Sequence, residues 1–175
     1  MERVICLFIG YVFGLFQTAY FYGKTKGIDI RKYGSGNAGT TNALRVLGTK
    51  AGLIVFAGDC LKCIIAVCIT RALFSTGHPE NIYLLCLYTG AGSIIGHNYP
   101  FYMGFKGGKG ISSTSGFILA FDLRIAAVCL AAFSVIVGTT RYVSLGSLTV
   151  VSICFVVGVI FGVNSMLSVE PANMA

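Results

Sequence analysis

Long apolar stretches recur along the chain and are separated by short polar segments rich in glycine. A helix needs about 20 mostly apolar residues to cross the hydrocarbon core of a bilayer, so the pattern predicts membrane-spanning helices. Six spans are expected, at residues 4–22, 51–72, 81–95, 111–121, 123–137 and 143–163. The first, second and last have full length, whereas the others are short and are expected to be tilted, broken or extended into the polar loops. The sequence therefore predicts an all-α integral membrane protein, a polytopic helical bundle.

The N-terminal apolar stretch has some features of a signal peptide. It follows one basic residue, Arg3, but it is longer than a usual signal-peptide core and lacks a clear small-residue cleavage site. We expect it to be retained as the first helix of a single membrane-embedded domain, residues 1–175.

Composition supports this class. The chain is 55% hydrophobic and only 11% charged, whereas soluble domains carry about a quarter charged residues. Seven cysteines lie in or beside apolar segments: Cys6, Cys60, Cys63, Cys68, Cys86, Cys129 and Cys154. Cys60 and Cys63 have the CxxC spacing, but no second pair or histidine cluster accompanies them. Packing as small apolar residues is therefore the favoured interpretation, and no metal site is expected.

The net charge of +7 is unevenly distributed. If the spans alternate, nine basic residues fall on one side: Lys24, Lys26, Arg31, Lys32, Arg45, Lys50, Lys106, Lys109 and Arg141. The positive-inside rule then places the glycine-rich loops in the cytoplasm and both termini outside. Topology and an anionic ligand explain the charge better than nucleic acid, which is not expected as a partner.

The first polar loop has the composition of an anion-binding cradle. Its glycines let the backbone N–H groups approach a ligand, its hydroxyl and amide side chains add donors, and Arg45 adds a planar cation suited to phosphate. The candidate ligands are Gly34, Ser35, Gly36, Asn37, Gly39, Thr40, Thr41, Asn42 and Arg45. The glycines also satisfy GxGxxG, but a membrane helix precedes them where a dinucleotide fold requires a strand, so a nucleotide site is rejected.

The second polar loop places two lysines among glycines at the start of a predicted helix. Its candidate ligands are Lys106, Gly107, Gly108, Lys109 and Gly110. The loop resembles a P-loop, but the glycine spacing is wrong and Gly110 stands where Ser or Thr is required. Helix N-termini favour anions, so a phosphate site is one interpretation, and a flexible positively charged loop is the other.

Three further polar residues have two interpretations each. Asp59 and Lys62 lie on one face of the second span, where a charge pair has either a functional role or a role in helix packing. His97, beside the second loop, is either a general base or an ordinary interfacial histidine. His78 is expected to be a loop residue on the opposite side.

Four segments together resemble the bacterial membrane family of acyl-phosphate:glycerol-3-phosphate acyltransferases. They are GSGNAGTTNALRVLGTKAG (34–52), GDCLK (58–62), GHNYPFYMGFKGGKG (96–110) and RYVSLGS (141–147), in the family's order and at similar spacing. The resemblance implies transfer of an acyl group from acyl phosphate to glycerol 3-phosphate, giving lysophosphatidic acid for phospholipid synthesis. It also implies a multi-pass protein of the bacterial plasma (inner) membrane, a monomer or a chain with a partner, that uses no cofactor.

The resemblance also implies roles for particular residues. Ser35 and Arg45 match the essential serine and arginine of the family's first loop, and residues 106–110 match its glycerol 3-phosphate segment. Ser144 and Ser147 match a serine-bearing loop that lines the site. We expect direct attack of the glycerol hydroxyl, with Arg45 and Lys106 holding phosphates, loop N–H groups stabilising the oxyanion, and either His97 or a substrate phosphate oxygen as the base.

The chain also departs from the family pattern. Ala38 replaces a usual proline, Cys63 replaces a common glycine, and the sequence stops at Ala175 where the family continues with a seventh helix and a basic segment. If that segment closes the site, weak or partner-dependent activity is expected. Two alternatives to an enzyme are therefore a non-catalytic family member and a transporter of an anionic metabolite, although the two loops are not repeats of each other.

Overall fold

The computed structural model describes residues 1–163, and these residues are helical with no strand among them. The α-helices are α1 (Glu2–Gly14), α2 (Thr18–Thr25), α3 (Thr40–Leu47), α4 (Thr49–Phe74), α5 (Ile82–Asn98), α6 (Ile111–Phe121), α7 (Leu123–Thr140) and α8 (Val143–Val163). Short 3₁₀ helices η1 (Ile30–Lys32), η2 (Pro79–Asn81) and η3 (Phe101–Met103) lie in the connections. This confirms the predicted all-α class.

Four segments are long and apolar enough to cross a bilayer. They are Glu2–Thr25, Thr49–Phe74, Leu123–Thr140 and Val143–Val163. The other two expected spans are shorter, with 17 residues in α5 and 11 in α6. At 1.5 Å per residue, α6 is about 16 Å long, roughly half the thickness of the hydrocarbon core. The expectation of short middle spans is therefore confirmed for α5 and α6, whereas it is wrong for residues 123–137, because α7 has 18 residues and is long enough to cross.

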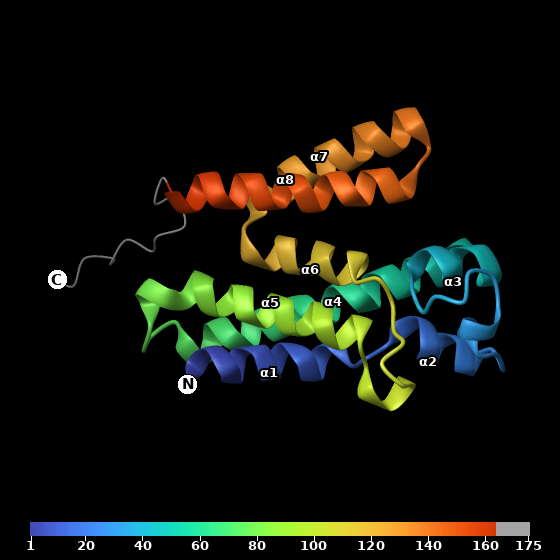
Figure 1. The fold of residues 1–175 in the computed structure, drawn as a ribbon, viewed down its shortest axis with the longest axis horizontal. Coiled ribbons are helices and arrows are strands. Elements are labelled where there is room, and N and C mark those ends of the chain that lie inside the picture. The colour runs from blue at the N-terminus through green and yellow to red at the C-terminus, as the bar shows by residue number, and fades with distance from the viewer. Residues whose placement is uncertain (164–175) are drawn as a thin grey trace.

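The helices form a bundle with the polar loops at one end (Figure 1). Helices α1, α4 and α5 lie side by side, α6 packs on α4, and the α7–α8 hairpin covers α6. Helices α2 and α3, residues 99–110 and the α7–α8 turn lie at the same end, and the α4–α5 turn lies at the other. This arrangement is the one that alternating spans predict.

The expected first span, residues 4–22, is not one continuous helix. It is interrupted at residues 15–17, between α1 and α2. A broken helix in a membrane needs other donors for its free carbonyl groups. Here the Tyr102 hydroxyl donates to the Leu15 carbonyl at 2.7 Å, and Lys62 donates to the carbonyl of Phe16 at 2.6 Å. These partners come from distant segments, so the local sequence does not reveal the break.

Helices α1 and α5 pack with their backbones in contact through glycines. A Cβ on Gly10 would lie 2.8 Å from the Ser93 amide nitrogen, and a Cβ on Gly96 would lie 3.1 Å from the Gly14 Cα. Small residues permit this approach and are common where membrane helices pack.

We predict that Gly92→Ala lowers the free energy of unfolding by about 1–3 kcal/mol, the usual range for overpacking. The added Cβ would lie 2.9 Å from the Tyr11 amide nitrogen, and backbone cannot move aside as a flexible side chain can. Gly158→Ala is the matched control, because a Cβ there meets nothing within 4 Å. Denaturant unfolding in detergent measures the difference, and equal stability of the two variants would contradict the close α1–α5 packing.

Candidate active site

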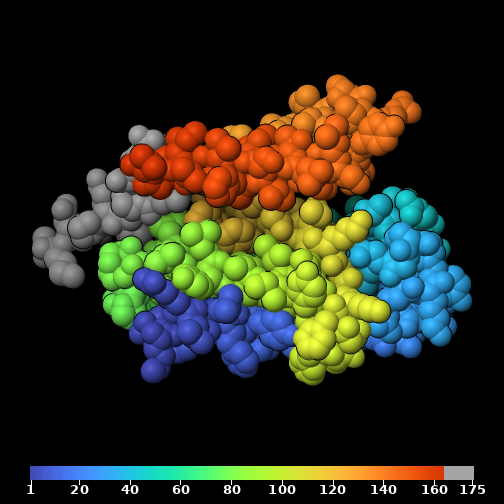
Figure 2. Space-filling model, viewed as in Figure 1, coloured from blue at the N-terminus to red at the C-terminus, as the bar shows by residue number. Residues whose placement is uncertain are grey.

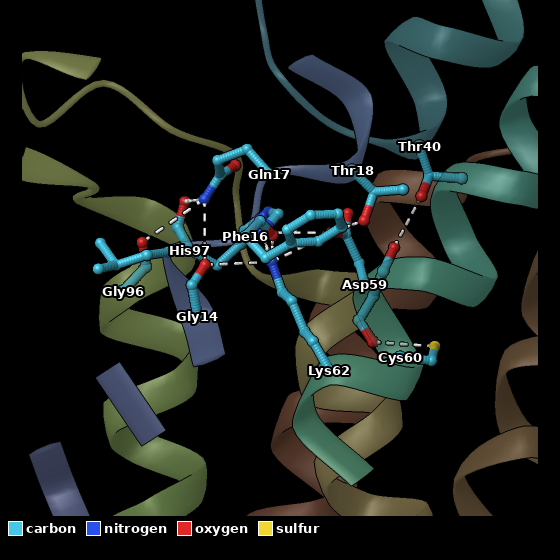
Figure 3. A network of polar contacts seen from close by, with 12 residues as sticks. Gly14, Phe16, Gln17, Thr18, Thr40, Asp59, Cys60, Lys62, Gly96 and His97 are labelled. Carbon is cyan, nitrogen blue, oxygen red and sulfur yellow. Dashed lines mark hydrogen bonds and ion pairs between the residues drawn. The ribbon is translucent and has the colours of Figure 1, made fainter. Parts of the chain in front are cut away.

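A buried cluster of charged side chains lies just beneath the polar loops (Figure 3). Asp59 and Lys62 project from α4 and His97 from α5, and each residue is at most 5% exposed. The Lys62 Nζ lies 3.1 Å from Asp59 Oδ1 and 2.7 Å from His97 Nδ1. The Thr18 hydroxyl donates to the same Asp59 oxygen at 2.9 Å. The cluster therefore joins α2, α4 and α5.

Lys62 and Gln17 fix the α1–α2 break to this cluster. Lys62 donates to the Phe16 carbonyl and, at 3.2 Å, to the Gly14 carbonyl. Gln17 is fully buried, and its Nε2 donates to the His97 carbonyl at 2.9 Å and to the Gly14 carbonyl at 3.3 Å. Sequence analysis missed Gln17, although a polar amide inside an apolar stretch is a signal that deserves notice.

The second loop folds back over His97. The amide N–H of Gly108 donates to the His97 carbonyl at 3.1 Å, and that of Gly107 donates to the Asn98 carbonyl at 3.0 Å. A Cβ on Gly108 would run into His97 Nε2 and would lie 2.9 Å from the Ala38 carbonyl oxygen. Gly108 is thus the point where the second loop, the first loop and His97 meet. Gly110, with φ of 77°, then turns the chain into α6.

The first loop is shaped by Asn42. This side chain is buried, and its Oδ1 accepts from the Ser35 amide at 2.9 Å. Its Nδ2 donates to the Tyr33 carbonyl at 3.0 Å and to the Ile30 carbonyl at 3.2 Å. Gly34 and Gly36 adopt positive φ values of 61° and 72°, which glycine tolerates best. Asn42, which is a predicted substrate ligand, thus bonds to the backbone of residues 30, 33 and 35.

The first loop is also more helical than expected. Helix α3 begins at Thr40, so Thr41, Asn42 and Arg45 are helical residues. The Thr40 and Ser112 hydroxyls lie 2.8 Å apart, and the Cys60 thiol donates to the Ser112 carbonyl at 3.1 Å. These contacts fasten the start of α3 to α6 and α4. Ser112 is a second residue that the sequence did not single out.

The predicted cationic ligands have unpaired charged groups within residues 1–163. Arg45, Lys106 and Lys109 are exposed, and among residues 1–163 none of them makes a side-chain hydrogen bond or ion pair. Ser35 and Thr41 are also exposed, Asn37 is half-buried, and Gly39 is buried. In Figure 2 the yellow atoms of the second loop lie beside the blue atoms of the α2–α3 region. The two predicted phosphate loops therefore share one end of the molecule.

Arg31 differs from these free cations. It makes two hydrogen bonds to the Asp29 carboxylate, at 2.8 and 3.0 Å, and its guanidinium lies over the Tyr20 ring. The Arg31 side chain lowers the pKa of Asp29 to about 2. Arg31 is therefore committed to the base of the first loop.

Ser144 and Ser147 lie in the first two turns of α8. Ser144 is exposed, whereas Ser147 is buried and donates to the Val143 carbonyl at 2.9 Å. Within residues 1–163 neither hydroxyl bonds to the first or second loop. They lie at the same end of the molecule as the loops but are not brought into the cluster (Figure 1).

An apolar groove runs along α1 and α4 and reaches the cluster. Its volume is about 470 Å³, within the range of small-molecule sites. It is lined by Val12, Phe13, Phe16, Gly58, Leu61, Lys62 and Ile65. Lys62 is the one charged residue in this lining.

These features define a multi-pass membrane protein with two glycine-rich loops that bear exposed cations at one end of a helical bundle. Residues 4–174 match the glycerol-3-phosphate acyltransferase family. The chain therefore belongs to this family, as the sequence predicted, and is an integral membrane acyltransferase of phospholipid synthesis.

Curated relatives and solved structures agree with this assignment. A glycerol-3-phosphate acyltransferase of Thermoanaerobacter sp. (strain X514) is 42% identical over 151 residues, covering 85% of this chain and 72% of the relative. One from Clostridioides difficile (strain 630) is 42% identical over 146 residues, covering 82% and 71%. The crystal structure of the integral membrane glycerol 3-phosphate acyltransferase PlsY (YgiH), in its glycerol 3-phosphate form, is similar with a TM-score of 0.82 and 34% identity, covering 93% of this chain and 78% of that one. Its lysophosphatidic acid form gives a TM-score of 0.80.

Proposed function

We propose that this chain transfers a fatty acyl group from acyl phosphate to glycerol 3-phosphate at the cytoplasmic face of the bacterial inner membrane. The glycerol hydroxyl attacks the acyl carbonyl carbon, an ester C–O bond forms, and phosphate leaves with the electrons of the broken C–O bond. The hydroxyl proton passes to a phosphate oxygen, so the leaving group is released as hydrogen phosphate. The product is lysophosphatidic acid. We further propose that a monomer, folded as one membrane-embedded domain, carries out this reaction.

The observation that carries the proposal is the meeting of two glycine-rich loops over one buried charge cluster. Both substrates bear phosphate, so two anionic subsites are needed. The first loop offers Arg45 and the second offers Lys106 and Lys109, all exposed and without a protein partner among residues 1–163. Backbone N–H groups and an arginine are suited to phosphate. The solved PlsY structures support this reading, since they include a glycerol 3-phosphate form and a lysophosphatidic acid form.

The positions of the loop residues and of the apolar groove suggest a role for each. Ser35 and Arg45 of the first loop are assigned to one phosphate, and Lys106 and Lys109 of the second loop to the other. The amide N–H groups of Lys109 and Gly110, which follow Gly108 and donate to no group within residues 1–163, are assigned to the oxyanion, where fixed dipoles lower the barrier. The apolar groove between α1 and α4 suits the acyl chain, because its lining is almost entirely hydrocarbon. The excess of basic residues on this side supports a cytoplasmic site.

Arg45→Ala is expected to lower kcat/KM for acyl phosphate by about 10- to 100-fold, because a hydrogen bond to a charged group contributes about 1.5–3 kcal/mol. The assay uses purified protein in nanodiscs with labelled glycerol 3-phosphate, and palmitoyl phosphate or palmitoyl-CoA as donor. Arg3→Ala is the matched control, since Arg3 is exposed in the first turn of α1, away from the loops.

Lysophosphatidic acid formed from palmitoyl phosphate but not from palmitoyl-CoA, and diminished by Arg45→Ala alone, would support the proposal. Product formation only from palmitoyl-CoA would assign a different donor. Absence of product from folded protein with either donor would favour a non-catalytic member of the family.

A further inference from the structure

The two ring nitrogens of His97 have different surroundings. Nδ1 lies 2.7 Å from Lys62 Nζ, a hydrogen-bonding distance, whereas it is 3.7 Å from Asp59 Oδ1, which is too far. Nε2 is on the other side of the ring, against Gly108, at the place where a Cβ would collide with it. Within residues 1–163 no hydrogen bond reaches Nε2. One nitrogen thus faces the buried charges, and the other faces the loops.

The surroundings of Lys62 decide which nitrogen carries the proton. Its Nζ is within 3.2 Å of two carbonyl oxygens, those of Gly14 and Phe16, and within 3.1 Å of the Asp59 carboxylate. These neighbours only accept, so they favour an ammonium group. An ammonium group has donors and no acceptor, so the fourth neighbour, His97 Nδ1, must accept as well. In a neutral imidazole whose Nδ1 accepts, the proton is on Nε2.

We infer that Lys62 is a positioning residue that holds His97 in the Nε2–H form. His97 then presents an N–H donor to the loop cradle, where it binds an anionic oxygen of the substrates. In this form it is not a base, because the nitrogen that faces the loops already carries a proton. Gln17 supports the geometry by holding the His97 carbonyl at 2.9 Å. This inference deepens the proposed function and depends on it for the identity of the anion.

The protonation pattern can be measured without any enzyme assay. His78 and His97 are the two histidines of the chain, so His78→Gln leaves His97 as the single imidazole. Two-bond ¹H–¹⁵N spectra of the ¹⁵N-histidine-labelled variant in nanodiscs distinguish the forms. We expect a protonated Nε2 and an unprotonated Nδ1. A proton on Nδ1, alone or together with one on Nε2, would overturn the inference even if acyl transfer is confirmed.

A pair of variants tests what the N–H group does. Glutamine can place an amide N–H near the position of Nε2, whereas leucine cannot, and both remove the ring acceptor that faces Lys62. We expect His97→Gln to keep kcat/KM within about fivefold of wild type and His97→Leu to lose about 10- to 100-fold. A raised KM for glycerol 3-phosphate would indicate its phosphate as the anion, and an equal fall of kcat and kcat/KM would indicate the oxyanion.

If His97 were a general base, the two variants would give a different result. Removal of a general base lowers the rate by about 10²–10⁴-fold whichever residue replaces it, because glutamine does not accept a proton at neutral pH. His97→Gln as inactive as His97→Leu would therefore overturn the donor role. If wild-type protein transfers no acyl group, the proposed function fails, and the NMR result still decides which nitrogen of His97 carries the proton.

Discussion

Lys62→Met is expected to lower the free energy of unfolding by about 3–5 kcal/mol, the usual effect of breaking a buried ion pair. Methionine fills a similar volume but leaves the Asp59 carboxylate buried without its cation. It also removes the donor for the Gly14 and Phe16 carbonyls at the α1–α2 break. Equilibrium unfolding in detergent, followed by circular dichroism, measures the change.

Two further variants test whether the loss of stability comes from the buried ion pair. Lys50→Met on the same helix is the matched control, because Lys50 is exposed and is expected to change stability by less than about 0.5 kcal/mol. The double variant Asp59→Leu/Lys62→Met is expected to be more stable than Lys62→Met alone, since it contains no unpaired buried charge. If Lys62→Met is as stable as Lys50→Met, the buried pair does not stabilise the fold.

Much of the fold is predictable from periodicity and length. The bounds of α6, 111–121, and the start of α8 at residue 143 agree with the predicted spans. Long apolar stretches form helices in a bilayer because no other local structure satisfies their backbone groups. The interruption at residues 15–17 is different, because its carbonyls are satisfied by Lys62 and Tyr102, which lie far away in the sequence. A local pattern contains no information about such partners.

The candidate site also combines features that the local sequence predicts with features that depend on contacts between distant segments. Glycines, hydroxyls and a cation predict an anion cradle in the first loop, whereas composition leaves two interpretations of the second loop, a phosphate site and a flexible positively charged loop. The sequence did not reveal that Asn42 is used to shape the first loop, or that Gln17 holds the His97 carbonyl. Both depend on tertiary contacts between segments that are not neighbours in the chain. The sequence predicts Asp59 and Lys62 as a charge pair, but it does not reveal that His97 joins them, which the distances in the structure show.

Gly108→Ala is expected to lower kcat/KM by about 100-fold or more. The added Cβ would run into His97 Nε2 and lie 2.9 Å from the Ala38 carbonyl oxygen, so the second loop must move away from the first. A displacement of about 1 Å between groups that orient substrates can reduce a rate by about 10²-fold. Steady-state kinetics with palmitoyl phosphate and glycerol 3-phosphate measures the loss.

Gly77→Ala is the matched control for this variant, because a Cβ there meets nothing within 4 Å and the residue lies in the α4–α5 turn, at the end remote from the loops. It should retain wild-type kinetics. The loss in Gly108→Ala should also exceed that in Arg45→Ala, since the methyl group disturbs both loops and His97 together, whereas Arg45→Ala removes one ligand. Wild-type activity in Gly108→Ala would mean that the two loops do not form one site, and the phosphate subsites would have to be assigned to separate surfaces.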